Sequence, residues 1–268
     1  MEYTLTNFFI LGPCSLESEE NYLKSLEYLK PHMEGRDWYF KASFDKANRT
    51  SINGGRGPGL DYSLDIFRKV KKSNPNIRLI TDVHEPWQVE KIADVIDVVQ
   101  IPAFLCRQTD LIVECARHFN KVNIKKGQWL GPNNLVVSVD KVRNTNPDAE
   151  VWLTERGTAF GYHRLVVDID IVDRIKKHYD KVIIDCTHAT QRSRDVYGTQ
   201  GRREVAERFF LSAPIYHYDG IFAECHLDPA CAVSDGDCQI QMERIPKLLE
   251  RLDNIKTCLS GWEDENLK

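Results

Sequence analysis

Residues Lys181–His188 read KVIIDCTH, an apolar run that ends in polar side chains. A short run of this kind, rich in β-branched residues, is typical of a strand that is buried on both faces of a parallel sheet. We therefore predict a strand over Lys181–Cys186, with Thr187 and His188 at its carboxyl end. In a barrel of parallel strands the active site lies at the carboxyl ends, so the placement of His188 indicates both a fold and a site.

The same pattern recurs along the chain. The strand-like runs are Phe8–Pro13, Trp38–Ala42, Ile77–Val83, Val95–Ile101, Val122–Lys125, Val151–Thr154, Lys181–Cys186 and Gly220–Ala223. Amphipathic, helix-like segments lie between them, for example Glu19–Met33, Tyr62–Lys72, Gln108–His118 and Val167–Lys177. Strands that alternate with helices predict parallel βαβ units. Eight such units in 268 residues favour an α/β fold, a (β/α)8 TIM barrel that forms one domain over residues 1–268.

Polar or ionisable residues stand at seven of the eight predicted strand ends. In chain order the ends carry Cys14, Lys41-Ala42-Ser43, Asp82-Val83-His84-Glu85, Pro102-Ala103-Phe104, Lys125-Lys126, Glu155-Arg156-Gly157, Thr187-His188 and Glu224-Cys225-His226. Surface loops are polar in any protein, so one such residue carries little weight. Their regular recurrence at strand ends predicts an active site at the mouth of the barrel.

Composition limits the classes of partner. The formal net charge is -4, which gives no indication of a nucleic-acid or membrane-surface partner. No stretch approaches the roughly 20 apolar residues of a membrane span, and the run Phe8–Leu11 is too short for a signal peptide. The eight cysteines form no CxxC pair, so we expect a reducing, cytoplasmic location without disulfides.

Basic residues gather at the predicted mouth, although the chain is acidic. They are Lys41, Lys46, Arg49, Lys125 and Arg156. Converging cations repel one another unless an anion neutralises them, and arginine and lysine both suit phosphate or carboxylate groups. The set predicts binding of phosphorylated substrates, whereas the alternative for any one residue is a salt bridge to Asp45, Asp82 or Glu155. We expect the glycine-rich run Gly54–Gly59 to be a loop that closes over this mouth.

Four further residues are candidate ligands of a divalent metal. They are Cys14, His188, Glu224 and Asp235. A thiolate, an imidazole and two carboxylates suit Zn, Fe, Mn or Co. The alternative is that Cys14 is a small buried apolar residue and that His188 is structural, because the four match no local metal motif.

Several longer motifs resemble one known family. They are GPCSLES (Gly12–Ser18), KASFDKANRTS (Lys41–Ser51), RGPGL (Arg56–Leu60), TDVHEP (Thr81–Pro86), QIPAFLCRQTDL (Gln100–Leu111), NIKKGQ (Asn123–Gln128), TERGTAFGY (Thr154–Tyr162), DCTHATQ (Asp185–Gln191) and AECHLDP (Ala223–Pro229). Together they resemble the 3-deoxy-D-manno-octulosonate-8-phosphate synthases, transferases of lipopolysaccharide biosynthesis. The resemblance implies condensation of phosphoenolpyruvate with D-arabinose 5-phosphate in a cytoplasmic homotetramer.

The resemblance also implies roles for individual residues. Those expected at the phosphoenolpyruvate carboxylate are Lys41, Ser43 and Lys46, and those at its phosphate are Lys125 and Arg156, with Ala103 and Arg107 nearby. Those expected at the aldose phosphate are Asn48, Arg49 and Thr50, with Asp82 and Gln128 lining the same cavity. Cys14 marks the metal-dependent members, where metal-independent members have Asn, and His188, Glu224 and Asp235 match the other ligands. The metal either orients the aldehyde or activates the attacking water.

Two other functions remain open at this point. A 3-deoxy-7-phosphoheptulonate synthase, which uses erythrose 4-phosphate, shares the GPCS start but typically has KPRTS where this chain has KANRTS. A non-catalytic barrel that senses phosphorylated ligands would not need both the cations and the metal ligands. Segments Asn53–Gly55 and Arg192–Arg203, which are expected to border the sugar, depart from the family pattern.

Overall fold

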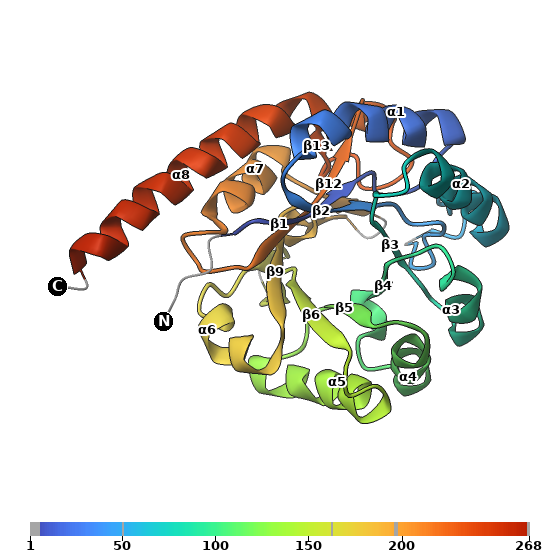
Figure 1. Ribbon diagram of the computed structural model, residues 1–268, viewed down its shortest axis with the longest axis horizontal. Coiled ribbons are helices and arrows are strands. Elements are labelled where there is room, and N and C mark those ends of the chain that lie inside the picture. The colour runs from blue at the N-terminus through green and yellow to red at the C-terminus, as the bar shows by residue number, and fades with distance from the viewer. Residues whose placement is uncertain (1–5, 50, 162, 196–197, 267–268) are drawn as a thin grey trace.

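The computed structural model describes residues 6–49, 51–161, 163–195 and 198–266. Eight parallel strands form a closed ring. They are β1 (Phe8–Gly12), β2 (Asp37–Lys41), β3 (Leu79–Asp82), β4 (Val98–Ile101), β5 (Lys121–Lys125), β6 (Glu150–Glu155), β9 (Lys181–Asp185) and β12 (Gly220–His226). Each strand pairs with the next, and β12 pairs with β1 to close the barrel. This arrangement confirms the predicted (β/α)8 fold (Figure 1).

Helices surround the ring on the outside (Figure 1). They are α1 (Glu19–Leu29), α2 (Leu60–Ser73), α3 (Pro86–Ile92), α4 (Thr109–His118), α5 (Pro132–Thr145), α6 (Ile171–Ile175), α7 (Arg203–Ser212) and α8 (Ile245–Asn266). Their apolar faces pack on the outward side chains of the strands, such as Phe9, Leu11 and Val99, and form the larger core. No helix in the described parts of the chain is long and apolar enough to cross a membrane.

Two helical segments differ from their predicted extent. The segment Val167–Lys177 forms only the short helix α6, which a 3-10 turn, Lys176–His178, follows. The Asp168 side chain accepts a hydrogen bond from the backbone of Asp170 at 3.1 Å, so this segment starts as a turn. Helix α1 ends at Leu29, and the remaining residues Lys30–Met33 form a 3-10 turn that contains a proline.

Short strands lie outside the ring. After β6, the two-residue strands β7 (Thr158–Ala159) and β8 (Leu165–Val166) pair antiparallel. After β9, β10 (Arg192–Asp195) pairs antiparallel with β11 (Gly198–Gln200). Strand β13 (Ile240–Gln241) extends the sheet beside β12. The short helical turns are Ala103–Leu105, His188–Thr190, Pro229–Cys231 and Met242–Arg244. Several of these additions follow strand ends and therefore border the mouth of the barrel.

The inner face of the ring carries the site. Its apolar layer is made by Phe8, Ile10, Tyr39, Ile80, Val98, Trp152, Ile183 and Phe222. Successive side chains of a strand point to opposite faces, so the residue two positions further along points inward again. Two positions after Tyr39, Ile183 and Phe222 stand Lys41, Asp185 and Glu224. The strands therefore place a charged layer directly above an apolar floor.

Candidate active site and metal centre

A cavity of about 930 Å³ opens at the carboxyl ends of the strands. Most of the predicted site residues line it: Lys41, Ser43, Lys46, Asn48, Arg49, Asp82, Ala103, Lys125, Gln128, Arg156, His188, Glu224 and Asp235. These residues come from every part of the sequence between β2 and the loop after β12. A cavity of this size holds two small phosphorylated molecules, since ligand pockets commonly measure about 300–1,000 Å³.

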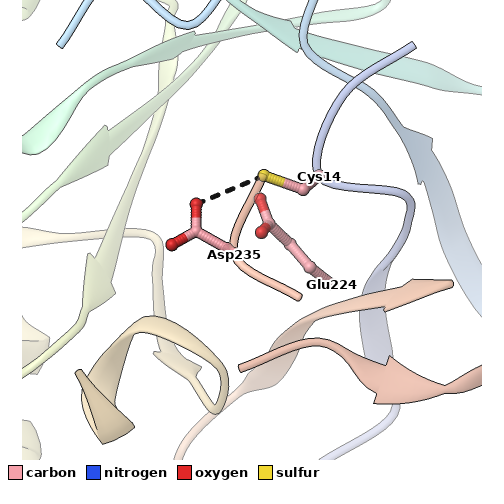
Figure 2. Close-up of side chains that lie close together, drawn as sticks. All are labelled: Cys14, Glu224 and Asp235. Atoms are coloured by element: carbon pink, nitrogen blue, oxygen red, sulfur yellow. Dashed lines mark hydrogen bonds between the residues drawn. The ribbon is translucent and has the colours of Figure 1, made fainter. Parts of the chain in front are cut away.

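Three candidate metal ligands converge at one side of this cavity. Cys14 follows β1, Glu224 lies in β12 and Asp235 lies in the loop after β12, and Figure 2 shows their side chains facing one another. Their ligand atoms all lie within 4.8 Å of one another. The Cys14 Sγ is 3.4 Å from the Oδ2 of Asp235, and the thiol is buried beneath the cavity.

The chemistry of this group fits a divalent cation. Burial, together with the nearby Glu224 carboxylate, raises the pKa of the Cys14 thiol well above its usual value. A thiolate forms there only with a compensating cation, as in metal binding. The Oε2 of Glu224 is buried without a hydrogen-bond partner among the described residues, which leaves a lone pair for a ligand. Asp235 adopts a φ of 52°, so its loop turns sharply to present the carboxylate.

His188 stands beside the group without joining it. Its Nε2 is 3.6 Å from the Oε2 of Glu224. Among the described residues, however, the group whose ligand atoms all lie within 4.8 Å of one another consists of Cys14, Glu224 and Asp235 and does not include His188. The Nδ1 of His188 contacts the Oδ2 of Asp185 at 2.7 Å. A carboxylate on one ring nitrogen fixes the ring and directs the other nitrogen, here Nε2, at the metal position.

Two lysines hold the opposite side of Glu224. The Lys41 Nζ donates to Glu224 Oε1 at 2.5 Å and to the Cys14 carbonyl at 2.9 Å. The Lys46 Nζ lies 4.0 Å from the same carboxylate and donates to the Ser43 hydroxyl at 3.0 Å. Burial alone would raise the pKa of Glu224, but Lys41 and His188 hold it well below its usual value. Glu224 is therefore a buried anion.

Close approach of two strands makes this contact possible. A Cβ on Gly12 would lie 2.1 Å from the Lys41 carbonyl oxygen, so a residue with a side chain cannot occupy this position without moving the backbone. The glycine brings the end of β1 against the end of β2. Cys14 and Lys41 therefore sit side by side beneath the cavity.

Lys125 and Arg156 form a second cationic group across the cavity. Lys125 pairs with Asp185, and its Nζ lies 3.1 Å from the centroid of the Phe222 ring. Burial lowers the pKa of Lys125 to about 8, although Asp185 opposes this change. The Arg156 guanidinium donates to Gln191 Oε1 at 2.6 Å, and its NH1 is buried with no hydrogen-bond partner in the described structure. A buried N–H without a partner indicates a place for an anion.

The ends of β2 and β3 meet through polar contacts. The Ser43 hydroxyl donates to Asp82, and the other oxygen of Asp82 lies 3.2 Å from His84 Nε2. Burial would raise the pKa of Asp82, but His84 and Lys46 hold it well below its usual value. Asp82 is thus ionised and can accept a hydrogen bond from a hydroxyl of a polyol substrate. Gln128, further round the cavity, has a buried Oε1 without a partner among the described residues.

Arg49 reaches from the loop after β2 towards the metal ligands. Its NH1 donates to the Ser234 hydroxyl at 2.8 Å, and its NH2 lies 3.9 Å from Asp235 Oδ2. Its Nε is buried without a partner among the described residues. A Cβ on Gly54 would lie 3.1 Å from the Arg49 side chain, so the glycine gives this arginine its space. The two ends of this loop are joined, since the Lys46 N–H donates to the Arg56 carbonyl at 2.6 Å.

The basic residues do face carboxylates, but not the ones named as the alternative. Lys41 and Lys46 face Glu224, Lys125 pairs with Asp185, and Arg49 lies 3.9 Å from Asp235. Asp45 instead pairs with Arg56, Glu155 lies 3.5 Å from Lys126, and Asp82 contacts Ser43 and His84.

Three predicted site residues are not among those that line the cavity. Cys14 is buried beneath it. Arg107 does not line it, and its carbonyl accepts a hydrogen bond from Lys141 at 2.9 Å. Thr50 lies outside the described residues.

Some site residues escaped the sequence reasoning. Asp185 contacts Lys125 and His188, whereas the sequence predicts the polar end of this strand at Thr187 and His188, two and three residues further on. The period of two from Ile183 would have indicated that Asp185 points inward. Gln191 and Ser234, which contact Arg156 and Arg49, follow no such period.

Known proteins match the chain over nearly its whole length. The profile described as the DAHP synthetase I family matches residues 5–260. A 2-dehydro-3-deoxyphosphooctonate aldolase of Wolinella succinogenes is 44% identical over 91% of this chain and 97% of its own. Proteins of the same name from Helicobacter hepaticus, 42% identical over 91% of this chain and 95% of theirs, and Trichlorobacter lovleyi, 44% identical over 92% and 91%, are similar.

Proposed function

Because this chain belongs to the DAHP synthetase I family, we propose that its barrel mouth performs the reaction of the octonate aldolases that it matches. The chain joins phosphoenolpyruvate to D-arabinose 5-phosphate with consumption of water. The products are 3-deoxy-D-manno-octulosonate 8-phosphate and inorganic phosphate. One observation carries the proposal. Two pairs of cations, Lys41 with Lys46 and Lys125 with Arg156, lie around the same cavity as the group of Cys14, Glu224 and Asp235.

Phosphoenolpyruvate takes the deep part of the cavity. Lys125 and Arg156 bind its phosphate, which the unpartnered NH1 of Arg156 supports. Lys41, Ser43 and Lys46 bind its carboxylate from the opposite side. Arginine and lysine next to a dianion give charge-assisted hydrogen bonds, which are about twice as strong as neutral ones.

The aldose phosphate takes the outer part. Arg49 and Asn48 hold its phosphate at the loop after β2, and the buried, unpartnered Nε of Arg49 supports this assignment. Asp82 and Gln128 accept or donate hydrogen bonds to the sugar hydroxyls. The aldehyde then faces the methylene carbon of phosphoenolpyruvate near Glu224 and Asp235.

Cys14, His188, Glu224 and Asp235 would hold a divalent metal ion. Zn, Fe, Mn and Co all suit this donor set, and a bound ion supplies Lewis acidity that orients the aldehyde or lowers the pKa of water. Asp185 keeps the His188 ring in place through its Nδ1.

The chemistry needs stabilisation of moving charge. The methylene carbon of phosphoenolpyruvate forms a bond to the aldehyde carbon, and the aldehyde oxygen becomes a hydroxyl. The oxygen of water adds to the enol carbon and one proton of that water goes to the former aldehyde oxygen; the resulting tetrahedral centre loses phosphate by cleavage of the C–O bond to give the ketone. Lys41, Lys46 and Arg156 are fixed by their partners before the reaction, so they stabilise these charges without reorganising.

A seven-carbon product from erythrose 4-phosphate is the nearest other activity. The relatives named above carry the octonate name, and this favours the five-carbon aldose. Release of phosphate from phosphoenolpyruvate in the presence of a panel of aldose phosphates tests the proposal. We expect D-arabinose 5-phosphate to give the highest kcat/KM, whereas no release with any aldose would contradict catalysis altogether.

We also propose that the enzyme acts as a cytoplasmic homotetramer. All eight cysteines are free, which supports a reducing compartment. Phe104 and Trp129 stack with ring centroids 6.1 Å apart and are more than half exposed beside the barrel mouth, which supports burial against another subunit. Light scattering coupled to size-exclusion chromatography tests the oligomeric state.

A further inference from the structure

Gln191 links the two halves of the site. It directly follows the turn His188–Thr190, and its side chain lines the cavity. Its backbone N–H donates to the His188 carbonyl at 3.1 Å, and its own carbonyl accepts from Leu165 N–H at 3.1 Å. The backbone of Gln191 is therefore held on both sides, and its side chain extends from a fixed position.

The amide of Gln191 spans the distance between a cation and an anion. Its Oε1 accepts from the NH2 of Arg156 at 2.6 Å, and its Nε2 donates to Oδ1 of Asp235 at 3.0 Å. Arginine can only donate and an ionised carboxylate can only accept, so these partners fix which end of the amide is oxygen. A carboxylate in this place would repel Asp235, and an ammonium would repel Arg156.

The two oxygens of the Asp235 carboxylate have different partners because Gln191 bridges Arg156 and Asp235. Oδ1 faces Gln191, while Oδ2 faces the Cys14 thiol at 3.4 Å and the Ser234 hydroxyl at 2.9 Å. On the other side, Arg156 gives NH2 to Gln191 and keeps its unpartnered NH1. One amide thus orients a proposed metal ligand and a proposed phosphate-binding residue together.

We propose that Gln191 is a positioning residue that holds the phosphate-binding arginine and the metal-binding carboxylate in register. This inference rests on the proposed function, because it assigns Arg156 to phosphoenolpyruvate and Asp235 to the metal. Loss of the bridge leaves the NH2 of Arg156 without this acceptor and holds Asp235 by its Oδ2 alone, so both side chains are less well oriented. It therefore weakens binding of both ligands, even though Gln191 touches neither reacting carbon.

Binding to the metal-free protein tests the proposal without a need for turnover. Gln191→Met removes the amide, and Gln191→Asn keeps it on a side chain that is too short to span both partners. Gln241→Met is the matched control, since Gln241 is also half-buried but lies outside the cavity-lining residues. Co²⁺ and phosphoenolpyruvate are each titrated by calorimetry into every protein, and the Tm reports on folding.

We expect each Gln191 variant to bind both Co²⁺ and phosphoenolpyruvate about 3- to 10-fold more weakly, the range for one lost hydrogen bond. Gln241→Met should bind both as the wild type does. Unchanged affinity for either ligand in a folded Gln191 variant overturns the bridge, while the proposed function stands if the wild type binds both. A wild-type protein that binds neither ligand overturns the bridge and the proposed function together.

Discussion

Replacement of Arg49 by alanine tests the division of the cavity between two phosphates. The Arg49 side chain is 22% exposed and its Nε has no hydrogen-bond partner among the described residues, so a phosphate at this place gains a partly desolvated, charge-assisted contact. Such a contact contributes about 1.5–3 kcal/mol. The contact to Asp235, at 3.9 Å, is long, so the main contact that Arg49 exchanges for a substrate phosphate is the hydrogen bond from its NH1 to the Ser234 hydroxyl at 2.8 Å.

Steady-state kinetics with each substrate varied in turn measures the effect. We expect Arg49→Ala to lower kcat/KM for the aldose phosphate by about 10- to 150-fold, mainly through KM, with a much smaller change for phosphoenolpyruvate. Arg56→Ala is the control, because Arg56 lies in the same loop but is 58% exposed and pairs with Asp45. Equal losses for both substrates, or a loss no larger than that of Arg56→Ala, would refute the assignment of Arg49.

Three further predictions concern the metal and Lys125. Enzyme treated with EDTA should lose activity and regain it with Mn, Co, Zn or Fe, whereas full activity in a rigorously metal-free sample would contradict the metal centre. Cys14→Asn should bind metal weakly yet keep measurable activity in EDTA, because an amide can hydrogen-bond where the thiol stood; activity no higher than that of Cys14→Ala would count against this. Burial lowers the pKa of Lys125 from its usual 10.5 to about 8, so its ammonium loses the proton as the pH rises through that value. The KM for phosphoenolpyruvate should therefore increase above about pH 8, and this increase should disappear in Lys125→Arg, whose guanidinium stays charged.

The barrel was predictable from the sequence because strand identity depends on local composition. Runs such as Lys181–Cys186 can be recognised as strands from their β-branched residues and from the polar residues that follow. All eight predicted runs overlap strands of the ring. Most of the site followed from the same signal, because strand ends meet at one mouth in this fold.

What the sequence could not provide is which side chains touch. His188 was predicted as a metal ligand, and its ring lies 3.6 Å from Glu224 but outside the close group of three. Gln191 joins Arg156 to Asp235 across segments far apart in the chain, and no local spacing encodes such a contact. Helix α6 is shorter than the predicted segment Val167–Lys177, because a turn at Asp168 competes with the helical spacing of apolar residues that predicted the longer helix.

A competition between two aldoses tests the central claim most directly. Purified enzyme receives phosphoenolpyruvate with equal amounts of D-arabinose 5-phosphate and erythrose 4-phosphate, and mass spectrometry identifies the sugar acid formed. We predict that the eight-carbon product, 3-deoxy-D-manno-octulosonate 8-phosphate, accumulates together with one equivalent of inorganic phosphate. A predominantly seven-carbon product, or no condensation product at all, would contradict the account.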